Sequence, residues 1–542
     1  MSSEKNSKNH LNLDNNRKQE KISKLHLVII LSCIMISGII IRAYYLPNDV
    51  PISLDGLQYF WYANDIAILN SLPIDHSPAN NGWPIFLSIF FKFYNSTNFM
   101  DYMFLQRIIS IALSSLTVIP IYFLAKKYFS KKIALIGTML FTFEPRIIQN
   151  SIFGISEPLF ILLVTSSIVC FLHQQKKIIV FAFMLISFAS IVRSEGIILL
   201  IAFTILYGIR FRNSKKISYE IPILILVFIL IILPMANYRV EVNGDDSLLA
   251  RIPNIFDQTN EPEQNTIAEN IQNSQKIDEM KNIFLLIGWA SIPFFIFLIP
   301  YGIYQVIKYE NTGIRSLLTI LFFISIPAIY AISFLPETRY LLILYPILSV
   351  MSLFSVKKYF DKFSNKNIGL IILIGLILIG SIAFLEIKKT DVNHEHESLK
   401  IAKIVSEKTG IINQYAMESG YLPIIGMQEL EEFPILKSNF KKLGNDMKHC
   451  VNIHACENII PVKSNNIIEF LQNSKEKGIT HLVIDNKEKR RAVFVNDIFE
   501  NEQNFSYLKK IYDSKEEQLS YQVKIFKINY DKFDCNVKEI CN

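Results

Sequence analysis

The sequence predicts a polytopic α-helical membrane protein with about eleven transmembrane helices and an exterior C-terminal α/β domain. Of its 542 residues, 51% are hydrophobic, and the mean hydropathy of +0.30 is high for a soluble protein. About eleven apolar runs are long enough to cross the ~30 Å hydrocarbon core. Because lipid cannot hydrogen-bond open backbone groups, we expect each run to be a helix. The runs are centred near residues 35, 114, 138, 164, 185, 202, 228, 294, 325, 347 and 376.

The distribution of lysine and arginine predicts the orientation of the chain. Basic clusters occur in the N-terminal tail and in alternate loops, whereas the loops between them carry only isolated basic residues. Basic loops stay in the cytoplasm, so we expect a multi-pass cell-membrane protein with a cytoplasmic N-terminus and an extracellular C-terminal domain. The net charge of +7 follows from this bias, and no nucleic-acid partner is expected. The basic loops are 126–132, 176–177, 210–216, 308–315 and 357–366.

Changes of composition divide the chain into three parts. Residues 1–24 are polar and predict a disordered cytoplasmic tail. Residues 25–385 hold the apolar runs and form the transmembrane domain, with a long first exterior loop at 46–103 and a further exterior loop at 238–281. Residues 386–542 are polar again and predict the exterior α/β domain.

The exterior domain carries both strand and helix patterns. His481–Asp485 is a short apolar run, and Tyr521–Tyr530 alternates with a period of two, so both are predicted to be strands. Ile467–Lys477 has the pattern of a helix. These segments together predict a mixed α/β fold.

Four cysteines also fall in this domain, namely Cys450, Cys456, Cys535 and Cys541. Close pairs of exterior cysteines indicate one or two disulfides formed in an oxidising compartment, with the pairing left open. A zinc site built from Cys450, His454 and Cys456 is the weaker alternative.

Asp55 is the leading catalytic candidate. It follows the first apolar run, so it emerges at the exterior face, and Tyr59 stands one helical turn after it. An acid kept beside hydrocarbon is a functional candidate because its position costs free energy. Its carboxylate can act as a general base on an acceptor hydroxyl or coordinate a cation. Asp75 and His76 follow in a turn-rich segment, where an exposed turn acid is the alternative interpretation.

Three isolated arginines, Arg146, Arg193 and Arg339, lie on the exterior side with an acid two positions away. One interpretation is structural, with ion pairs to Glu144, Glu195 and Glu337. The other is a clamp for a phosphate group, to which a guanidinium is well matched. Arginine in exterior turns runs against the usual charge bias, which favours the clamp, most of all at Arg339.

Glu157 begins a further exterior motif, because it is followed by Pro158 at the start of an apolar run. An acid in the first turn complements the helix dipole, and proline is tolerated there. Glu157 is therefore either a capping acid or part of a substrate site.

Together these motifs resemble the GT-C superfamily of membrane glycosyltransferases. The resembling branch contains protein O-mannosyltransferases and the lipid A aminoarabinose transferase. The motifs are Asp55 with Tyr59 and Ala63, Ser156–Leu159, Arg193–Gly196, and Arg339 and Tyr340 with Pro346. Gly56 departs from the protein mannosyltransferases, which have a second acid there. All three tryptophans precede the exterior domain, which disfavours the sequon-reading motif of oligosaccharyltransferases.

The resemblance implies a sugar transfer, with inversion, from a polyprenyl- or dolichyl-phosphate donor to an acceptor protein, lipid or glycan on the outer face. Asp55 would activate the acceptor. Basic residues near Arg193 and Arg339 would hold the lipid phosphate. The residues predicted to contact substrates are Tyr59, Asp75, His76, Arg146, Glu157, Arg193, Arg339 and Tyr340.

A lipid or glycan transporter or flippase is the alternative function, although such proteins usually show inverted repeats and helices broken at the midplane. No P-loop and no Gly-rich dinucleotide motif is present, so the energy of the reaction is expected to arrive in the substrate. No cofactor is required by the motifs, and a divalent cation is left open.

Overall fold

A computed structural model describes residues 23–52, 54–74, 77–78, 80–96, 98–244, 281–308, 312–389, 392–410, 412–413, 459–460, 464, 466–486 and 492–538. The chain divides into two compact units. The helical unit comprises Met1–Leu46, Pro78–Trp83 and Arg107–Lys389. The mixed unit comprises Pro47–Ser77, Pro84–Gln106 and Thr390–Asn542.

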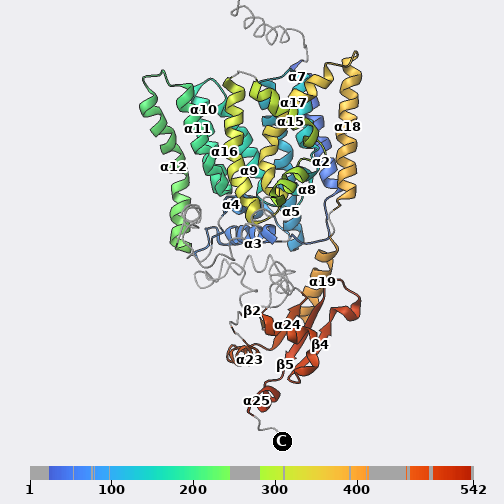
Figure 1. The fold of residues 1–542 in the computed structure, drawn as a ribbon. Helices are drawn as coiled ribbons and strands as arrows, with labels where there is room; N and C mark the ends of the chain where they lie inside the picture. The colour runs from blue at the N-terminus through green and yellow to red at the C-terminus, as the bar shows by residue number, and fades with distance from the viewer. Residues whose placement is uncertain are drawn as a thin grey trace, which may run out of the picture. The chain divides into compact units, whose positions relative to one another are not determined.

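The helical unit is built from helices that run side by side, with α12 at one edge and α18 at the opposite edge (Figure 1). Two 3₁₀ turns, η2 (Ser194–Gly196) and η4 (Thr338–Leu344), interrupt it. Its helices are α2 (Lys24–Tyr44), α6 (Val118–Lys126), α7 (Lys131–Thr142), α8 (Pro145–Ser151), α9 (Glu157–Phe171), α10 (Lys176–Val192), α11 (Ile197–Arg210), α12 (Ile217–Asn243), α15 (Phe295–Lys308), α16 (Thr312–Phe334), α17 (Tyr345–Phe360) and α18 (Lys366–Ile387). Helix α5 (Phe99–Leu116) belongs partly to each unit.

The predicted apolar runs coincide with helices, except that the run near residue 294 falls at a break. There Lys281–Ala290 and Phe295–Lys308 meet at 99°. In the described part of the chain, six helices are long and apolar enough to cross a membrane, or seven with this bent pair. The chain is thus a multi-pass membrane protein, and the count of about eleven spans stays a prediction. The shorter helices α7, α9, α10 and α11 have 12, 15, 17 and 14 residues.

Arg42 joins the N-terminal helix to its neighbours. Its guanidinium is fully buried in the last turn of α2, where the negative end of the helix dipole favours a cation. Nη1 donates to the carbonyls of Gly38 (2.9 Å) and Thr142 (3.2 Å). Nε donates to Ser151 Oγ (3.0 Å), and Nη2 donates to Ser114 Oγ (3.1 Å). One side chain therefore ties α2 to α5, α7 and the end of α8.

The segment 78–83 is held against the helices by two buried side chains. Asn81 accepts a hydrogen bond from Arg239 Nη1 of α12 (3.2 Å), and both residues have no exposed surface. Trp83, also fully buried, donates from Nε1 to the carbonyl of Gly154 (3.1 Å). Gly154 has φ of +70°, a conformation that favours glycine.

The same segment touches the end of α10. Asn80 Oδ1 accepts a hydrogen bond from the backbone N–H of Ser194 (3.3 Å). Gly82 lies so close that a Cβ there would come within 2.7 Å of Val192 N. Residues 80–82 therefore support the chain at Arg193, which lies between Val192 and Ser194.

Basic side chains gather at the other end of α9. Lys127 Nζ donates to the carbonyl of Leu172, and Arg210 Nη1 donates to the carbonyl of Phe171 (3.1 Å). Cations are favourable at a helix C-terminus, where carbonyl groups lack helical partners. Two of the basic loops thus meet at the end of α9 that lies opposite Glu157.

The mixed unit contains helices α3 (Leu54–Leu69) and most of α4 (Gly82–Phe93), and the C-terminal sheet. The sheet has the strand order β2-β1-β3-β5-β4, parallel at β2-β1-β3 and antiparallel at β3-β5-β4. The predicted strands are present as β3 and β5, and the predicted helix as α23. The elements are α19 (Asn393–Lys408), β1 (Ile412–Asn413), β2 (Ile459–Ile460), α23 (Ile467–Glu476), β3 (His481–Asp485), α24 (Val493–Glu500), β4 (Leu508–Asp513), β5 (Val523–Ile528) and α25 (Tyr530–Lys538), with 3₁₀ turns η8 (Glu502–Asn504) and η9 (Ser514–Glu517).

The core of the C-terminal sheet is apolar and continuous, and Phe470, Ile484, Ile498 and Phe526 are buried in it. Helices α23 and α24 pack against the apolar residues that alternate along the strands. Cys535 in α25 is disulfide-bonded, as expected of an oxidising compartment. The other three exterior cysteines, and with them the alternative zinc site, lie outside the described residues.

Replacing Arg42 with methionine should destabilise the protein by about 2–4 kcal/mol, because the oxygens that it satisfies stay buried without a donor. Thermal unfolding in detergent measures the effect. Arg212→Ala removes an exposed arginine of the same unit and should leave the unfolding temperature unchanged. Equal unfolding temperatures for the two variants would show that the Arg42 network does not stabilise the fold.

Replacing Gly82 with alanine should destabilise the protein by about 1–3 kcal/mol, because the added methyl group collides with the backbone of α10. Gly375→Ala on α18 is the matched control, since a Cβ there meets no atom within 4 Å. Alanine favours helix over glycine, so the control should be neutral or stabilising. Equal losses in both variants would contradict the close approach at Gly82.

Candidate functional site

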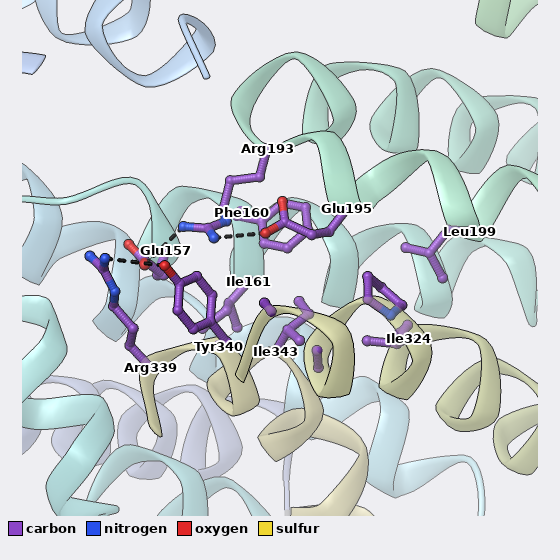
Figure 2. A pocket seen from close by; sticks show the side chains of 13 residues that line it. Glu157, Phe160, Ile161, Arg193, Glu195, Leu199, Ile324, Arg339, Tyr340 and Ile343 are labelled. Atoms are coloured by element: carbon purple, nitrogen blue, oxygen red, sulfur yellow. Dashed lines mark hydrogen bonds and ion pairs between the residues drawn. The ribbon is translucent and has the colours of Figure 1, made fainter. Parts of the chain in front are cut away.

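The helical unit holds a pocket with an empty volume of about 450 Å³. Its polar lining consists of Glu157, Arg193, Glu195, Arg339 and Tyr340. Its apolar lining includes Ile161, Leu199, Ile324, Pro327, Ala328 and Ile343. Figure 2 shows the charged side chains together at one end of the pocket, with Leu199 and Ile324 toward the other. The pocket therefore has a polar head and an apolar wall.

Four chain segments supply this lining, and three of them change conformation at the site, whereas α16 runs past it as a continuous helix. Helix α9 begins at Glu157, with Pro158 in its first turn. Helix α10 ends at Val192, and the extended backbone of Arg193 (φ −150°, ψ 131°) leads into η2. Tyr340 lies in η4, a 3₁₀ turn that precedes α17. Because the helices end here, polar side chains from several turns converge.

Arg193 is the centre of the polar head. Its Nη1 donates to Glu157 Oε1 at 2.9 Å, and its Nη2 donates to Glu195 Oε1 at 2.8 Å. Nη1 also lies 3.4 Å from Ser156 Oγ. The Arg193 side chain is 10% exposed, so these charge-assisted bonds form in a largely desolvated place. The ion pair with Glu157 joins residues 36 positions apart in the sequence.

Arg339 forms the second half of the polar head. Its Nε pairs with Glu337 Oε2 at 2.5 Å, and its Nη2 donates to the Tyr340 hydroxyl at 3.3 Å. The guanidinium carbon of Arg339 lies 5.1 Å from the centroid of the Tyr340 ring, and the guanidinium carbon of Arg193 lies 5.7 Å from it. Both distances suit cation–π contacts. Two guanidinium groups therefore approach one aromatic ring.

The three predicted arginine–glutamate pairs are all present. Arg193 pairs with Glu195 and Arg339 pairs with Glu337 at the pocket. The third pair joins Arg146 and Glu144 at 3.4 Å, with the glutamate fully buried.

Arg146 lies at a different place from the other two arginines. It donates to the carbonyls of Trp289 and Ile292, at the break of the bent helix pair. The hydroxyl of Tyr345 donates to a third carbonyl there, at 2.7 Å. A guanidinium satisfies the unpaired carbonyls at a helix end and suits its negative dipole. Arg146 is not among the residues that line the pocket.

The remaining predicted site residues belong to the mixed unit or lie outside the described residues. Asp55 stands in the first turn of α3 and is partly buried, and Tyr59 stands one turn later and is buried. Asp75 and His76 fall outside the described residues. The roles of these four residues stay predictions.

The same helix α3 carries buried polar atoms that are not among the predicted site residues. Trp61 Nε1, Asn64 Nδ2 and Asp65 Oδ2 are buried and have no hydrogen-bond partner among the described residues. Burial raises the pKa of the Asp65 carboxyl well above its usual value. The spacing of three and four residues puts the side chains on one helix face, which is the signal available in the sequence.

No group of three or more His, Cys, Asp or Glu side chains is arranged as metal ligands in the part of the chain that the structure describes. The polar head consists of arginine–carboxylate pairs instead.

The comparisons agree with this architecture. Residues 84–238 match the model of the family described as dolichyl-phosphate-mannose-protein mannosyltransferase. The apo oligosaccharyltransferase of Archaeoglobus fulgidus has a TM-score of 0.56 at 12% identity, covering 86% of this chain and 70% of that one. ArnT from Cupriavidus metallidurans, bound to undecaprenyl phosphate, has a TM-score of 0.53 at 9% identity, covering 93% of this chain and 98% of that one.

No curated protein matches the sequence. At 9–12% identity the two solved structures establish the fold. Family model and fold both confirm the resemblance that the sequence motifs predicted. The chain therefore has the fold of the GT-C superfamily of membrane glycosyltransferases.

Proposed function

We propose that this protein transfers a sugar, with inversion, from a polyprenyl- or dolichyl-phosphate donor to an acceptor on the outer face of the cell membrane. The observation that carries the proposal is the pocket that joins Arg193 and Arg339 to an apolar wall. A lipid phosphate has the same two parts, an anionic head and a hydrocarbon tail. The acceptor is a protein, a lipid or a glycan.

The chemistry of the pocket suits such an amphiphile. A planar guanidinium binds phosphate oxygens through parallel N–H bonds, and two guanidinium groups are near the Tyr340 ring. Leu199, Ile324 and Ala328 offer an apolar surface to the first part of a tail. Because lipid is itself apolar, these contacts position the tail, and the charged head supplies most of the selectivity for a lipid phosphate.

The orientation of the helical unit in the membrane follows from its two ends. Lys127 and Arg210 lie at the end of α9 that we assign to the cytoplasm. Glu157 begins the opposite end, which we assign to the exterior. Helix α9 is about 22 Å long, shorter than the ~30 Å hydrocarbon core. The polar head would therefore sit below the outer surface, within reach of a lipid head group.

We assign Asp55 as the general base. Its carboxylate takes the proton of an acceptor hydroxyl, whose oxygen attacks the anomeric carbon from the face opposite the phosphate. The bond between the anomeric carbon and the phosphate oxygen breaks, and lipid phosphate leaves with the bonding pair. Arg193 and Arg339 stabilise the charge that develops on that phosphate. Attack from the opposite face inverts the configuration.

Two solved relatives of the same fold support a lipid-phosphate donor. One structure of ArnT from Cupriavidus metallidurans is bound to undecaprenyl phosphate. AglB from Archaeoglobus fulgidus has been solved with an inhibitory peptide and a dolichol-phosphate, at 12% identity to this chain and a TM-score of 0.52.

A transporter or flippase is the second candidate, and the bent helix pair is the observation in its favour. In transporters the ends of broken helices bind the substrate. Here Arg146 and Tyr345 already bind carbonyls at the break. We therefore prefer the transferase.

Asp55→Asn should lower kcat for sugar transfer by at least about 100-fold, because the amide cannot accept the acceptor proton. Binding of lipid phosphate should be unchanged. Asp49→Asn is the control, since its side chain is 72% exposed and pairs with His396. Transfer is measured with purified protein and a polyprenyl-phosphate sugar. Full activity in Asp55→Asn would rule out the proposed mechanism.

Arg193→Ala should weaken undecaprenyl phosphate binding by about 10- to 100-fold, as expected for the loss of charge-assisted hydrogen bonds. Arg193→Lys keeps the positive charge but not the paired N–H groups of the guanidinium, so the loss of binding affinity should be smaller than in Arg193→Ala. Binding is titrated in detergent micelles with folding monitored in parallel. Unchanged binding in a folded Arg193→Ala would remove the pocket from the proposal.

A further inference from the structure

We propose that Glu195 is a displaceable counter-ion, which competes with the lipid phosphate for Arg193 and so limits how tightly the product is held. The inference rests on the proposed function and adds a role for one residue. It concerns how the same pocket both binds and releases a phosphate.

The arginine that would bind phosphate is already fully engaged. Each terminal nitrogen of Arg193 donates to a carboxylate: Nη1 to Glu157 at 2.9 Å and Nη2 to Glu195 at 2.8 Å. At the polar head, three carboxyl groups, those of Glu157, Glu195 and Glu337, pair with only two guanidinium groups, those of Arg193 and Arg339. A phosphate can form two hydrogen bonds to the Arg193 guanidinium only if one of the two carboxylates moves away.

Glu195 is the carboxylate that can leave Arg193. Its side chain is 23% exposed, against 6% for Glu157. Glu157 is also fixed in the first turn of α9, where the helix dipole favours an acid and Ser156 Oγ lies 3.5 Å away. Glu195 stands in the short turn η2, two residues from the arginine that it binds. A rotation of its side chain is enough to release Nη2.

The displaced carboxylate would have a favourable place to go. Glu195 stands two residues before Ile197, where α11 begins. The N-terminal end of a helix carries partial positive charge, worth about 0.3–1 kcal/mol to a nearby anion. The exchange would thus cost little, and Glu157 would keep Arg193 in position while Glu195 moves.

Arg339 repeats the arrangement on the other side of the polar head. Its partner Glu337 is also two residues away and is 51% exposed. The carboxylate is again the partner that can turn to solvent, so Glu337 is a second, weaker competitor. The two arginines would then bind phosphate at the expense of two mobile glutamates.

The test is Glu195→Gln in the full-length protein, titrated with undecaprenyl phosphate in detergent micelles and, separately, with inorganic phosphate. Removing the competitor should lower the dissociation constant for the lipid phosphate about tenfold, or 1.4 kcal/mol. The affinity for inorganic phosphate should also rise in Glu195→Gln. Inorganic phosphate should bind far more weakly than the lipid phosphate in every variant, because it has no tail. In steady-state transfer assays, KM and kcat should both fall as product release slows.

Three further variants separate competition from support. Glu157→Gln should weaken binding, because Arg193 loses the partner that holds it in place. Glu220→Gln removes an ion-paired glutamate outside the pocket, where Glu220 binds Lys176 at 2.5 Å, and should leave affinity unchanged. Glu337→Gln should tighten binding by a smaller factor than Glu195→Gln. Because the Glu337 side chain is exposed, this variant should fold normally, so a change in affinity would report on the competition itself.

Weaker or equal binding in a folded Glu195→Gln would overturn the inference, since Glu195 would then support Arg193 and not compete with the phosphate. That result leaves the proposed function intact if the wild-type protein binds undecaprenyl phosphate. If the wild-type protein binds no lipid phosphate, the proposed function itself fails.

Discussion

Buried guanidinium groups must find oxygen partners inside the helical unit, and this requirement governs how its helices meet. Arg42, Arg146, Arg193 and Arg239 are all buried there. A buried charge without partners costs several kcal/mol, so each arginine draws carbonyl, hydroxyl, amide or carboxylate oxygens from other elements. The contacts that result join segments that lie far apart in the sequence. Apolar packing alone would not specify these junctions, because lipid is as apolar as leucine.

The chemical nature of the partner separates structural arginines from the pocket arginines. Besides side-chain partners, Arg42 and Arg146 each bind two backbone carbonyls, which cannot move away without disturbing a helix. Arg193 and Arg339 bind side-chain carboxylates, which can exchange for another anion. The same residue type therefore fastens the fold at one place and, in our proposal, binds a phosphate at another.

The position of the pocket depends on helices that end early. Helices α9 and α10 have 15 and 17 residues, and both have an end at the polar head, together with the turns η2 and η4. Irregular backbone is tolerated in a membrane protein where it lines a cavity. Supporting contacts from residues 80–83 fix this irregular region, since Asn80 holds the N–H of Ser194 and Gly82 packs on Val192.

The sequence by itself predicted the helical membrane fold and most helix positions, and it offered the local arginine–glutamate pairs as one of two interpretations. Apolar runs predict helices because lipid allows no other spanning structure, and Arg193 pairs with Glu195 because two residues separate them. The GT-C resemblance also came from motifs read in order along the chain. Only the tertiary structure decided that Glu157 binds Arg193 across 36 residues, and that Arg146 serves a helix break. These contacts depend on how helices pack, and hydropathy carries no information about which helix faces which.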